Sequence, residues 1–263
     1  MSYTCRMLQM SRQAMYQYQR RQRKETVQEL TVVSRVRALR HLMPRVGARK
    51  LLKHLGEPGL GRDKFFEILR RHGLLVKRRR RYTITTQSDH TLPAYPNLLP
   101  GTRVEAVNQV WVADQTYIRL RQGFCYLSLL TDLYSRKIVG FDVASTLEAR
   151  GPISALRMAL RSVANPEGLI HHSDRGTQYC STEYTALLRQ SRCRISMTEP
   201  RRPDQNATAE RINGILKTEF FLDSTFNSID DALKAVQQSV YIYNNIRLHT
   251  SLGYLTPCLM HAA

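Results

Sequence analysis

The chain lacks the cysteine patterns of disulfide-stapled or zinc-binding proteins. Its five cysteines are odd in number and scattered, and no two of them form a Cys-x-x-Cys pair. They are Cys5, Cys125, Cys180, Cys193 and Cys258. We therefore expect reduced cysteines, and the sequence excludes the class of small secreted domains held together by disulfides.

Long apolar runs are also missing. The sequence contains no stretch of about 18 apolar residues and no charged segment leading into an apolar run that ends in small residues. It therefore predicts neither a membrane partner nor a signal peptide, and we expect the protein in the cytoplasm. A Gly-rich phosphate loop ending in Lys-Ser or Lys-Thr is absent too, so we expect no nucleotide cofactor.

Acidic residues are scarce in the first part of the chain. Residues 1–100 contain 22 Lys and Arg against 6 Asp and Glu, whereas residues 101–263 contain 18 against 15. A dense positive charge on one folded unit indicates a polyanion partner, because each neutralised phosphate releases condensed counterions. A solubility surface or an RNA-binding surface of the ribosomal kind would give the same charge balance.

The basic part of the sequence predicts short helices. Residues 1–24 are predicted to form a short helical hairpin in which Ser11 caps a helix that starts at Arg12. Residues 25–76 are predicted to hold three helices, of which Pro44 ends the first and a turn over 56–61 separates the second from the third. The third helix is expected to start at Asp63 as N-cap and to end at Gly73.

This arrangement predicts a helix-turn-helix domain that binds DNA. The last helix has a cationic polar face made of Arg62, Lys64, Arg70 and Arg71, which we expect in a major groove. A three-helix bundle with a solvated basic face is the alternative. Residues 77–103 are expected to form a basic linker whose charged run crosses the sugar-phosphate backbone, or else a solvated tether. That run is Lys77, Arg78, Arg79, Arg80 and Arg81.

The nearly neutral part, residues 104–263, has the pattern of a mixed α and β domain. Strands are predicted from Val110 to Ile118, over 124–130 and 137–143, and in the short segments 168–172 and 195–197. Helices are predicted over 152–163, 181–189, 207–221 and 229–243. The order βββαβαβα with a helical tail predicts a ribonuclease-H-like mixed-sheet domain with C-terminal helices, so the whole chain is α+β.

Three acids lie at the ends of these predicted elements. Asp114 stands among apolar neighbours in the first strand, where a buried carboxylate needs a compensating partner. Asp174 directly follows a strand, and Glu210 is near the start of a helix, where the helix dipole favours an anion. Oxygen ligands suit Mg²⁺ or Mn²⁺, and two such cations stabilise the attacking and leaving oxygens of phosphodiester exchange. Taken singly, each acid is better explained as a turn residue or an ion-pair partner.

Three sequence blocks resemble the signatures of the DDE transposase and retroviral integrase superfamily. They are WVADQTYI around Asp114, HSDRGTQY around Asp174 and NATAE ending at Glu210, with 35 residues between the last two acids. The block YNNIRLHTSL from Tyr243 and the closing Leu-Thr-Pro are similar to the second-frame protein of bacterial insertion sequences that use ribosomal frameshifting. The resemblance covers nearly the whole chain.

The resemblance implies a function for several residues. Asp114, Asp174 and Glu210 would be the catalytic metal ligands for two Mg²⁺ ions, with Mn²⁺ as a possible substitute, and Lys217 would face transposon-end DNA. The family blocks also supply supporting residues, namely Asn206, His172, Arg175, Tyr243, Arg247 and His249. Many relatives have an Asp where this chain has Gln205, with Asp204 one position earlier, so we expect no catalytic role for that acid. Asp132 and Asp142 are predicted to be structural.

The predicted activity is DNA transposition, in which a nicked inverted-repeat end supplies a 3′-hydroxyl that attacks a second phosphodiester in target DNA. The resemblance further implies a bacterial, nucleoid-associated protein that works as a homo-oligomer on double-stranded DNA, with an upstream-frame protein or fused segment as a further partner. A transposase-derived DNA-binding regulator without catalysis and a stand-alone ribonuclease-H-like nuclease are the alternatives.

Overall fold

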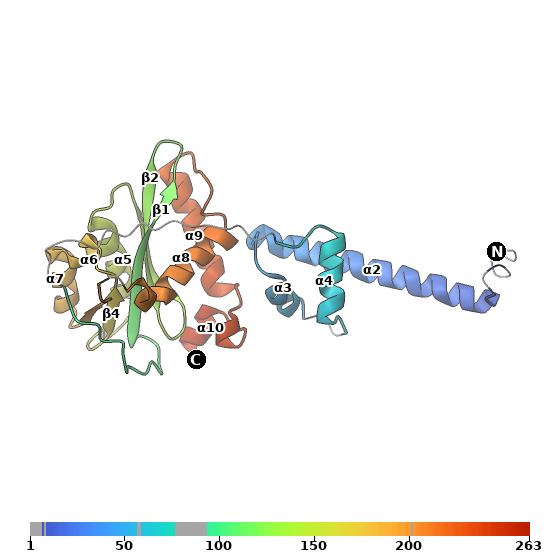
Figure 1. The fold of residues 1–263 in the computed structure, drawn as a ribbon, viewed down its shortest axis with the longest axis horizontal. Coiled ribbons are helices and arrows are strands. Elements are labelled where there is room, and N and C mark those ends of the chain that lie inside the picture. Colours follow the sequence, from blue (N-terminus) through green and yellow to red (C-terminus); the bar gives the residue numbers. More distant parts are fainter. Residues whose placement is uncertain (1–6, 8, 57–58, 77–93, 201) are drawn as a thin grey trace. The chain divides into compact units, whose positions relative to one another are not determined.

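The computed structural model describes residues 7, 9–56, 59–76, 94–200 and 202–263. The chain divides into two compact units, Met1–Arg78 and Arg79–Ala263, each with its own core. Both units are drawn in Figure 1. The cationic run from Lys77 to Arg81 and Cys5 lie outside the described residues, so their predicted roles remain predictions.

The N-terminal unit begins with one long helix, α2, which spans Arg12–Leu42. Ser11 caps it as predicted, since its hydroxyl accepts a hydrogen bond from the Ala14 N–H at 3.1 Å. The expected division near residue 24 is wrong, because the helix continues through it. No Gly or Pro interrupts residues 12–42, and the apolar periodicity starts late only because the packed side chains begin at Val32.

Two short helices pack against the C-terminal part of α2. They are α3 over Ala48–Leu55 and α4 over Arg62–Arg71. Their shared core contains Val32, Val36, Leu51, Phe65 and Leu69. The three helices predicted for this region are therefore present, and the first ends at Leu42, shortly before Pro44.

The two ends of α4 differ in how well they match the prediction. The expected N-cap, Asp63, is wrong: Gly61 is the N-cap, and the Asp63 carboxylate lies in the first turn, where it pairs with Arg62 at 2.8 Å. The predicted end at Gly73 is confirmed, because this glycine has φ +63° and the following Leu74 N–H donates to the Leu69 carbonyl at 2.7 Å.

The C-terminal unit is built on a five-stranded mixed sheet in the order β3-β2-β1-β4-β5. The strands are β1 Val110–Arg119, β2 Phe124–Asp132, β3 Ile138–Ala144, β4 Ile170–Ser173 and β5 Arg194–Met197. The first three strands pair antiparallel, whereas β4 runs parallel to both β1 and β5. This confirms the predicted mixed sheet, and the structure adds that the last two strands pair in parallel.

Helices cover both faces of this sheet (Figure 1). On one side are α5 Arg150–Arg161, the short α6 Thr177–Cys180 and α7 Thr182–Gln190; on the other are α8 Ala207–Glu219 and α9 Ile229–Asn245. A terminal helix, α10 Pro257–Ala262, packs against α9, and short 3₁₀ turns lie at Pro203–Asn206 and Thr250–Leu252. No described helix has both the length and the apolar character needed to cross a membrane.

A close approach fixes α5 on the sheet. A Cβ atom at Gly140 of β3 would collide with the carbonyl oxygen of Ala155 in α5, so only glycine permits this spacing. The resulting core contains Trp111 and Leu130 from the sheet with Leu156, Tyr184 and Leu188 from the helices. The central strands of the sheet are therefore held in place by a well-packed layer of helices.

Candidate active site

Asp114 lies in the middle of β1, on the strand that forms the centre of the sheet. Its carboxylate is half-buried, and Oδ2 accepts a hydrogen bond of 2.7 Å from Nδ2 of Asn213 in α8. Burial and the negative charge of Asp174 raise the pKa of Asp114 to about 7, although the Asn213 hydrogen bond acts in the opposite direction. The carboxyl group is thus poised to take up either a proton or a cation near neutral pH.

The parallel pairing of β1 and β4 places Asp174 beside Asp114. Val112 is paired with His172, and each acid follows its paired residue by two positions. The two acids therefore occur at the same level, just beyond the segment in which β1 and β4 are paired, with Asp114 in the middle of β1 and Asp174 at the carboxyl end of β4. Asp174 Oδ1 accepts a hydrogen bond of 2.9 Å from the Gly176 N–H, which fixes the turn that follows β4.

Glu210 is delivered by the first turn of α8 and its side chain is exposed. Two asparagines hold this turn against β1: Asn206 Nδ2 donates to the Ala113 carbonyl at 2.9 Å, and Asn213 binds Asp114. Burial and then the charge of Asp174 raise the pKa of Glu210, with a further contribution from Asp204. The charge of Asp174 thus raises the pKa of both other predicted acids, so the three carboxylates interact electrostatically.

The chemistry of this site fits a hard divalent cation. The charge of Asp174 acts on both Asp114 and Glu210, and the oxygen atoms of all three carboxylates are of the type that such a cation prefers. Within the described parts of the chain, no group of three or more His, Cys, Asp or Glu side chains is already drawn together as tightly as a metal ion requires. Mutual repulsion among the acids opposes such closure, and positive charge placed between them would remove that repulsion.

Lys217 lies two helical turns after Glu210 on α8, with Asn213 between them. Its ammonium nitrogen is 4.6 Å from the centre of the Tyr117 ring on β1. Asn213 contacts β1 as well, through Asp114, so α8 directs both Asn213 and Lys217 toward this strand, and Glu210 lies on the same face of the helix. Lys217 therefore contacts the strand that carries Asp114, three residues further along it.

The histidines of β4 are held inside the fold. His172 is fully buried, and its Nδ1 is 2.8 Å from the Ser196 hydroxyl, which itself accepts the Leu98 N–H. Burial lowers the pKa of His172 to about 4 and that of His171 to about 3. Both rings are therefore neutral at physiological pH, which is consistent with packing roles and leaves the predicted supporting role of His172 indirect.

Other predicted supporting residues tie together segments around the site. Arg175, directly after Asp174, donates to the Thr198 carbonyl at 2.9 Å and so joins the β4 turn to the segment after β5. Tyr243 donates to the Arg136 carbonyl at 3.1 Å. Asp132 is fully buried and accepts hydrogen bonds from the Asn108 and Ser135 N–H groups, which supports its predicted structural role.

Arg247 and His249 belong to a buried ion-pair cluster. Arg247, with 2% of its side chain exposed, forms two hydrogen bonds with the Glu219 carboxylate at 2.7 and 2.8 Å. Its third nitrogen lies 2.8 Å from His249 Nε2, and the Tyr243 ring packs against His249. The cluster fastens the end of α8 to the segment after α9, and so fixes the helix that carries Glu210.

Sequence reasoning missed two residues of this assembly, Asn213 and Glu219. Asn213 was discoverable, because it lies three positions after Glu210 and therefore on the same helix face. Glu219 left no such signal, since its partner Arg247 is 28 residues away in the chain. Only the fold shows that this carboxylate is used structurally.

The raised pKa of Asp114 predicts how stability depends on pH in the absence of metal. Because the folded-state pKa of about 7 exceeds the ordinary 3.8, the folded protein holds a proton that the unfolded chain releases between these values. This contribution is fully present below about pH 4 and is lost as the pH rises through about 7, and it amounts to about 2 to 4 kcal/mol. Urea unfolding in a chelating buffer at several pH values measures it.

Asp114→Asn is the matched variant for this titration, since the amide has a similar shape and cannot ionise. The stability of the wild type falls as the pH rises from about 4 to about 7, and we expect the variant to lack this fall. Its free energy of unfolding should therefore exceed that of the wild type above pH 7. Parallel pH profiles of the two proteins would show that the carboxylate is not desolvated in the folded state.

Comparisons with known proteins agree with this geometry. An integrase core domain family matches residues 104–203, and a second integrase core domain family matches residues 191–257. A 31 kDa protein of insertion element IS600 from Shigella sonnei is 36% identical over 260 residues, covering 96% of this chain and 95% of that protein. Transposase InsF of insertion sequence IS3A from Escherichia coli (strain K12) is 33% identical over 263 residues, covering 96% and 91%.

A solved structure shares the fold. A chain of the simian T-cell lymphotropic virus intasome, determined in complex with PP2A regulatory subunit B56 gamma, aligns with a TM-score of 0.53 and 21% identity. The alignment covers 86% of this chain and 74% of that chain. The sequence relatives and the integrase core match show that this protein belongs to the DDE transposase and integrase superfamily, among the transposases of bacterial insertion sequences.

Proposed function

We propose that the protein cuts DNA at the inverted-repeat ends of its insertion sequence and joins the released 3′ ends to target DNA, with Asp114, Asp174 and Glu210 as metal ligands. The observation that carries this proposal is the pairing of β1 with β4, which gives Asp114 and Asp174 the same level on adjacent strands. The repulsion between Asp174 and the other two acids supports a shared cation site.

Two Mg²⁺ ions, or Mn²⁺ in their place, would lower the barrier by stabilising the attacking and leaving oxygens of the phosphodiester. The chain's own residues hold the ligands in place for this. Asn213 orients the Asp114 carboxylate through its 2.7 Å hydrogen bond, and Asn206 holds the start of α8 against β1. Glu210 stands in the first turn of α8, where the helix dipole favours a negative charge.

Lys217 is placed to bind the DNA end. A phosphate group close to the three acids would add negative charge to a site whose carboxylates already repel one another, so a neighbouring cation is required to offset that charge. Lys217 would supply this charge from the same helix as Glu210, and its ammonium group lies over the ring of Tyr117 on the strand that bears Asp114. The same two elements therefore carry both the ligands and the cation.

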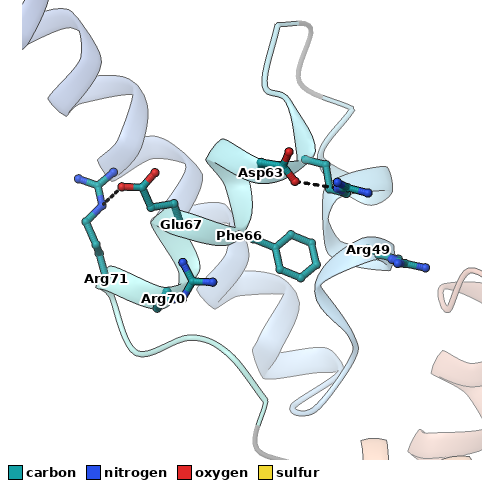
Figure 2. Close-up of a pocket in the computed structure, with 7 residues that line it drawn as sticks. Arg49, Asp63, Phe66, Glu67, Arg70 and Arg71 are labelled. Atoms are coloured by element: carbon teal, nitrogen blue, oxygen red, sulfur yellow. Dashed lines mark hydrogen bonds and ion pairs between the residues drawn. The ribbon is translucent and has the colours of Figure 1, made fainter.

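The N-terminal unit would bind duplex DNA through α4. An open pocket lies along this helix, lined by Arg49, Arg62, Asp63, Phe66, Glu67, Arg70 and Arg71. Figure 2 shows the Phe66 ring between Arg49 and Arg70. Arg71 instead pairs with Glu29 of α2 at 3.0 Å, so it positions α4, and Lys64 and Arg70 are exposed for contact with phosphates.

Removing one exposed cation from α4 is expected to weaken DNA binding in a salt-dependent way. For Arg70→Gln, the slope of log affinity against log salt should fall by about 0.9, the value for one lost phosphate contact. Fluorescence anisotropy with an inverted-repeat duplex over a salt series measures this slope.

Arg192→Gln is the matched control, because it removes the same charge from an exposed arginine in the C-terminal unit that pairs with Glu167. Equal slopes for the two variants and the wild type would show that α4 makes no phosphate contact at Arg70. A fall in both variants would show that net charge alone governs binding.

A strand-joining assay tests the proposed activity. Purified full chain, alone and with the protein of the upstream reading frame, is incubated with labelled inverted-repeat ends, target DNA and Mg²⁺. We expect joined products that require the metal and form from a multimer assembled on DNA. Nicking without joining would point to a nuclease, and a footprint without cleavage under either condition would point to a DNA-binding regulator.

A further inference from the structure

A continuous row of cationic and aromatic side chains leads away from the three acids. Lys217 Nζ lies 4.6 Å from the centre of the Tyr117 ring, and this ring meets Phe124 edge-on at 5.4 Å between centroids. The Arg119 guanidinium carbon then lies 5.3 Å from the centre of the Phe124 ring. We call these four residues the aromatic row.

The aromatic row starts at the candidate active site. Tyr117 follows Asp114 by three positions on β1, and Lys217 follows Glu210 by seven positions on α8. Phe124 and Arg119 are directly paired across the β1-β2 hairpin, near its tip. The row therefore extends from the acids along the hairpin, on the part of β1 beyond its pairing with β4.

The hairpin tip is held in place by backbone hydrogen bonds. Phe226, in the segment after α8, donates its N–H to the Arg119 carbonyl at 3.0 Å and accepts the Arg121 N–H at 2.9 Å. Gly123, with φ +86°, closes the turn by accepting the Leu120 N–H at 3.0 Å. The backbone that carries Arg119 and Phe124 is therefore held in place, which lowers the entropy lost when a ligand binds to their side chains.

The chemistry of the row favours a nucleic-acid strand with unpaired bases. Phe124 is 41% exposed and Arg119 is exposed, so an aromatic face and a cation are offered together. Unpaired bases stack on aromatic rings regardless of their sequence, and neighbouring cations bind the phosphates between them. Duplex DNA cannot use the rings in this way, because its bases are already stacked on one another.

We propose that the aromatic row seats unpaired nucleotides that flank the cleaved bond. A base replaces the Arg119 guanidinium over the Phe124 ring, and the displaced cation pairs with the adjoining phosphate, while Lys217 holds the phosphate nearest the acids. Tyr117 supports Phe124 from its edge. This inference rests on the proposed strand cleavage, and it adds that the DNA end is bound in a locally unpaired form.

The test compares two short DNA duplexes in buffer without divalent metal, so that binding is measured without cleavage. One duplex is fully paired, and the other has an unpaired flank that contains a fluorescent adenine analogue. The full wild-type chain is expected to bind the flanked duplex roughly tenfold more tightly and to quench the analogue by stacking. Phe124→Leu should lose both effects, whereas Phe124→Trp should keep them.

Tyr241→Leu is the matched control, because Tyr241 is a 63% exposed aromatic residue on α9, outside the row. It should keep the preference for the flanked duplex. The inference is overturned if the wild type binds both duplexes equally, if Phe124→Leu behaves as the wild type, or if Phe124→Leu changes only the oligomeric state. Thermal melting of each variant shows that it is folded.

Strand joining is measured in parallel on the same proteins with Mg²⁺. Joining that depends on Asp174 but shows no effect of an unpaired flank would overturn this inference and leave the proposed function intact. If joining is absent both with and without the protein of the upstream reading frame, while the flanked duplex is still preferred through Phe124, the row binds unpaired DNA but the proposed function is wrong.

Discussion

Asp174→Asn is expected to reduce strand joining at least about a thousandfold, because the central acid of the cluster would no longer supply a charged metal ligand. The expectation is the same for Asp114→Asn and Glu210→Gln. Each change keeps the shape of the side chain and removes its negative charge, so none of the three variants should fail to fold. Single-turnover joining of a labelled inverted-repeat end, with Mg²⁺ in excess, measures the loss.

The matched control is Asp204→Asn. This acid is close enough to raise the pKa of Glu210, but its carboxylate is exposed and pairs with Arg202 at 3.0 Å. We expect its joining rate to stay within about twofold of the wild type, because surface ion pairs contribute little. Near-normal joining by Asp174→Asn, or an equal loss in Asp204→Asn, would contradict the assignment of the three ligands.

Glu219→Leu should destabilise the C-terminal unit by about 3 to 5 kcal/mol, because it leaves the buried Arg247 guanidinium without its charged partner. Arg247→Leu should cost less, since the Glu219 side chain is 16% exposed and can recover some hydration, whereas only 2% of Arg247 is exposed. Urea unfolding followed by circular dichroism measures both free energies.

Two further variants show whether the loss comes from the unpaired charge. The double variant Glu219→Leu with Arg247→Met removes both charges and should recover much of the stability. Glu167→Leu breaks an exposed pair with Arg192 and should change the free energy of unfolding by about 0.5 kcal/mol or less. If Glu219→Leu costs no more than Glu167→Leu, the buried pair does not hold α8 in place.

The sheet and its helices were largely predictable from local sequence. Within residues 110–144, segments rich in β-branched and aromatic residues are separated by short turn segments. Such segments form strands because their side chains pack well on the half-buried surface of a sheet. Asp114 was found because it stands among apolar strand residues, where an unpaired carboxylate is costly, and Asp174 because it directly follows a strand. The family blocks then joined Glu210 to them.

Features that depend on contacts between distant segments could not be predicted. The level shared by Asp114 and Asp174 follows from the pairing of Val112 with His172, which lie 60 residues apart. The use of Glu219 by Arg247 arises in the same way. The single helix across residue 24 was missed for another reason: in the part of the chain that the structure describes, its buried side chains begin only at Val32, so the preceding residues carry no apolar period.

Anomalous diffraction from crystals grown with Mn²⁺ tests the metal site most directly. The expected result is manganese density bounded by the carboxylates of Asp114, Asp174 and Glu210, and its loss in crystals of Asp174→Asn. Manganese bound elsewhere, with the three acids left apart, would contradict the claim that this sheet edge is the catalytic centre.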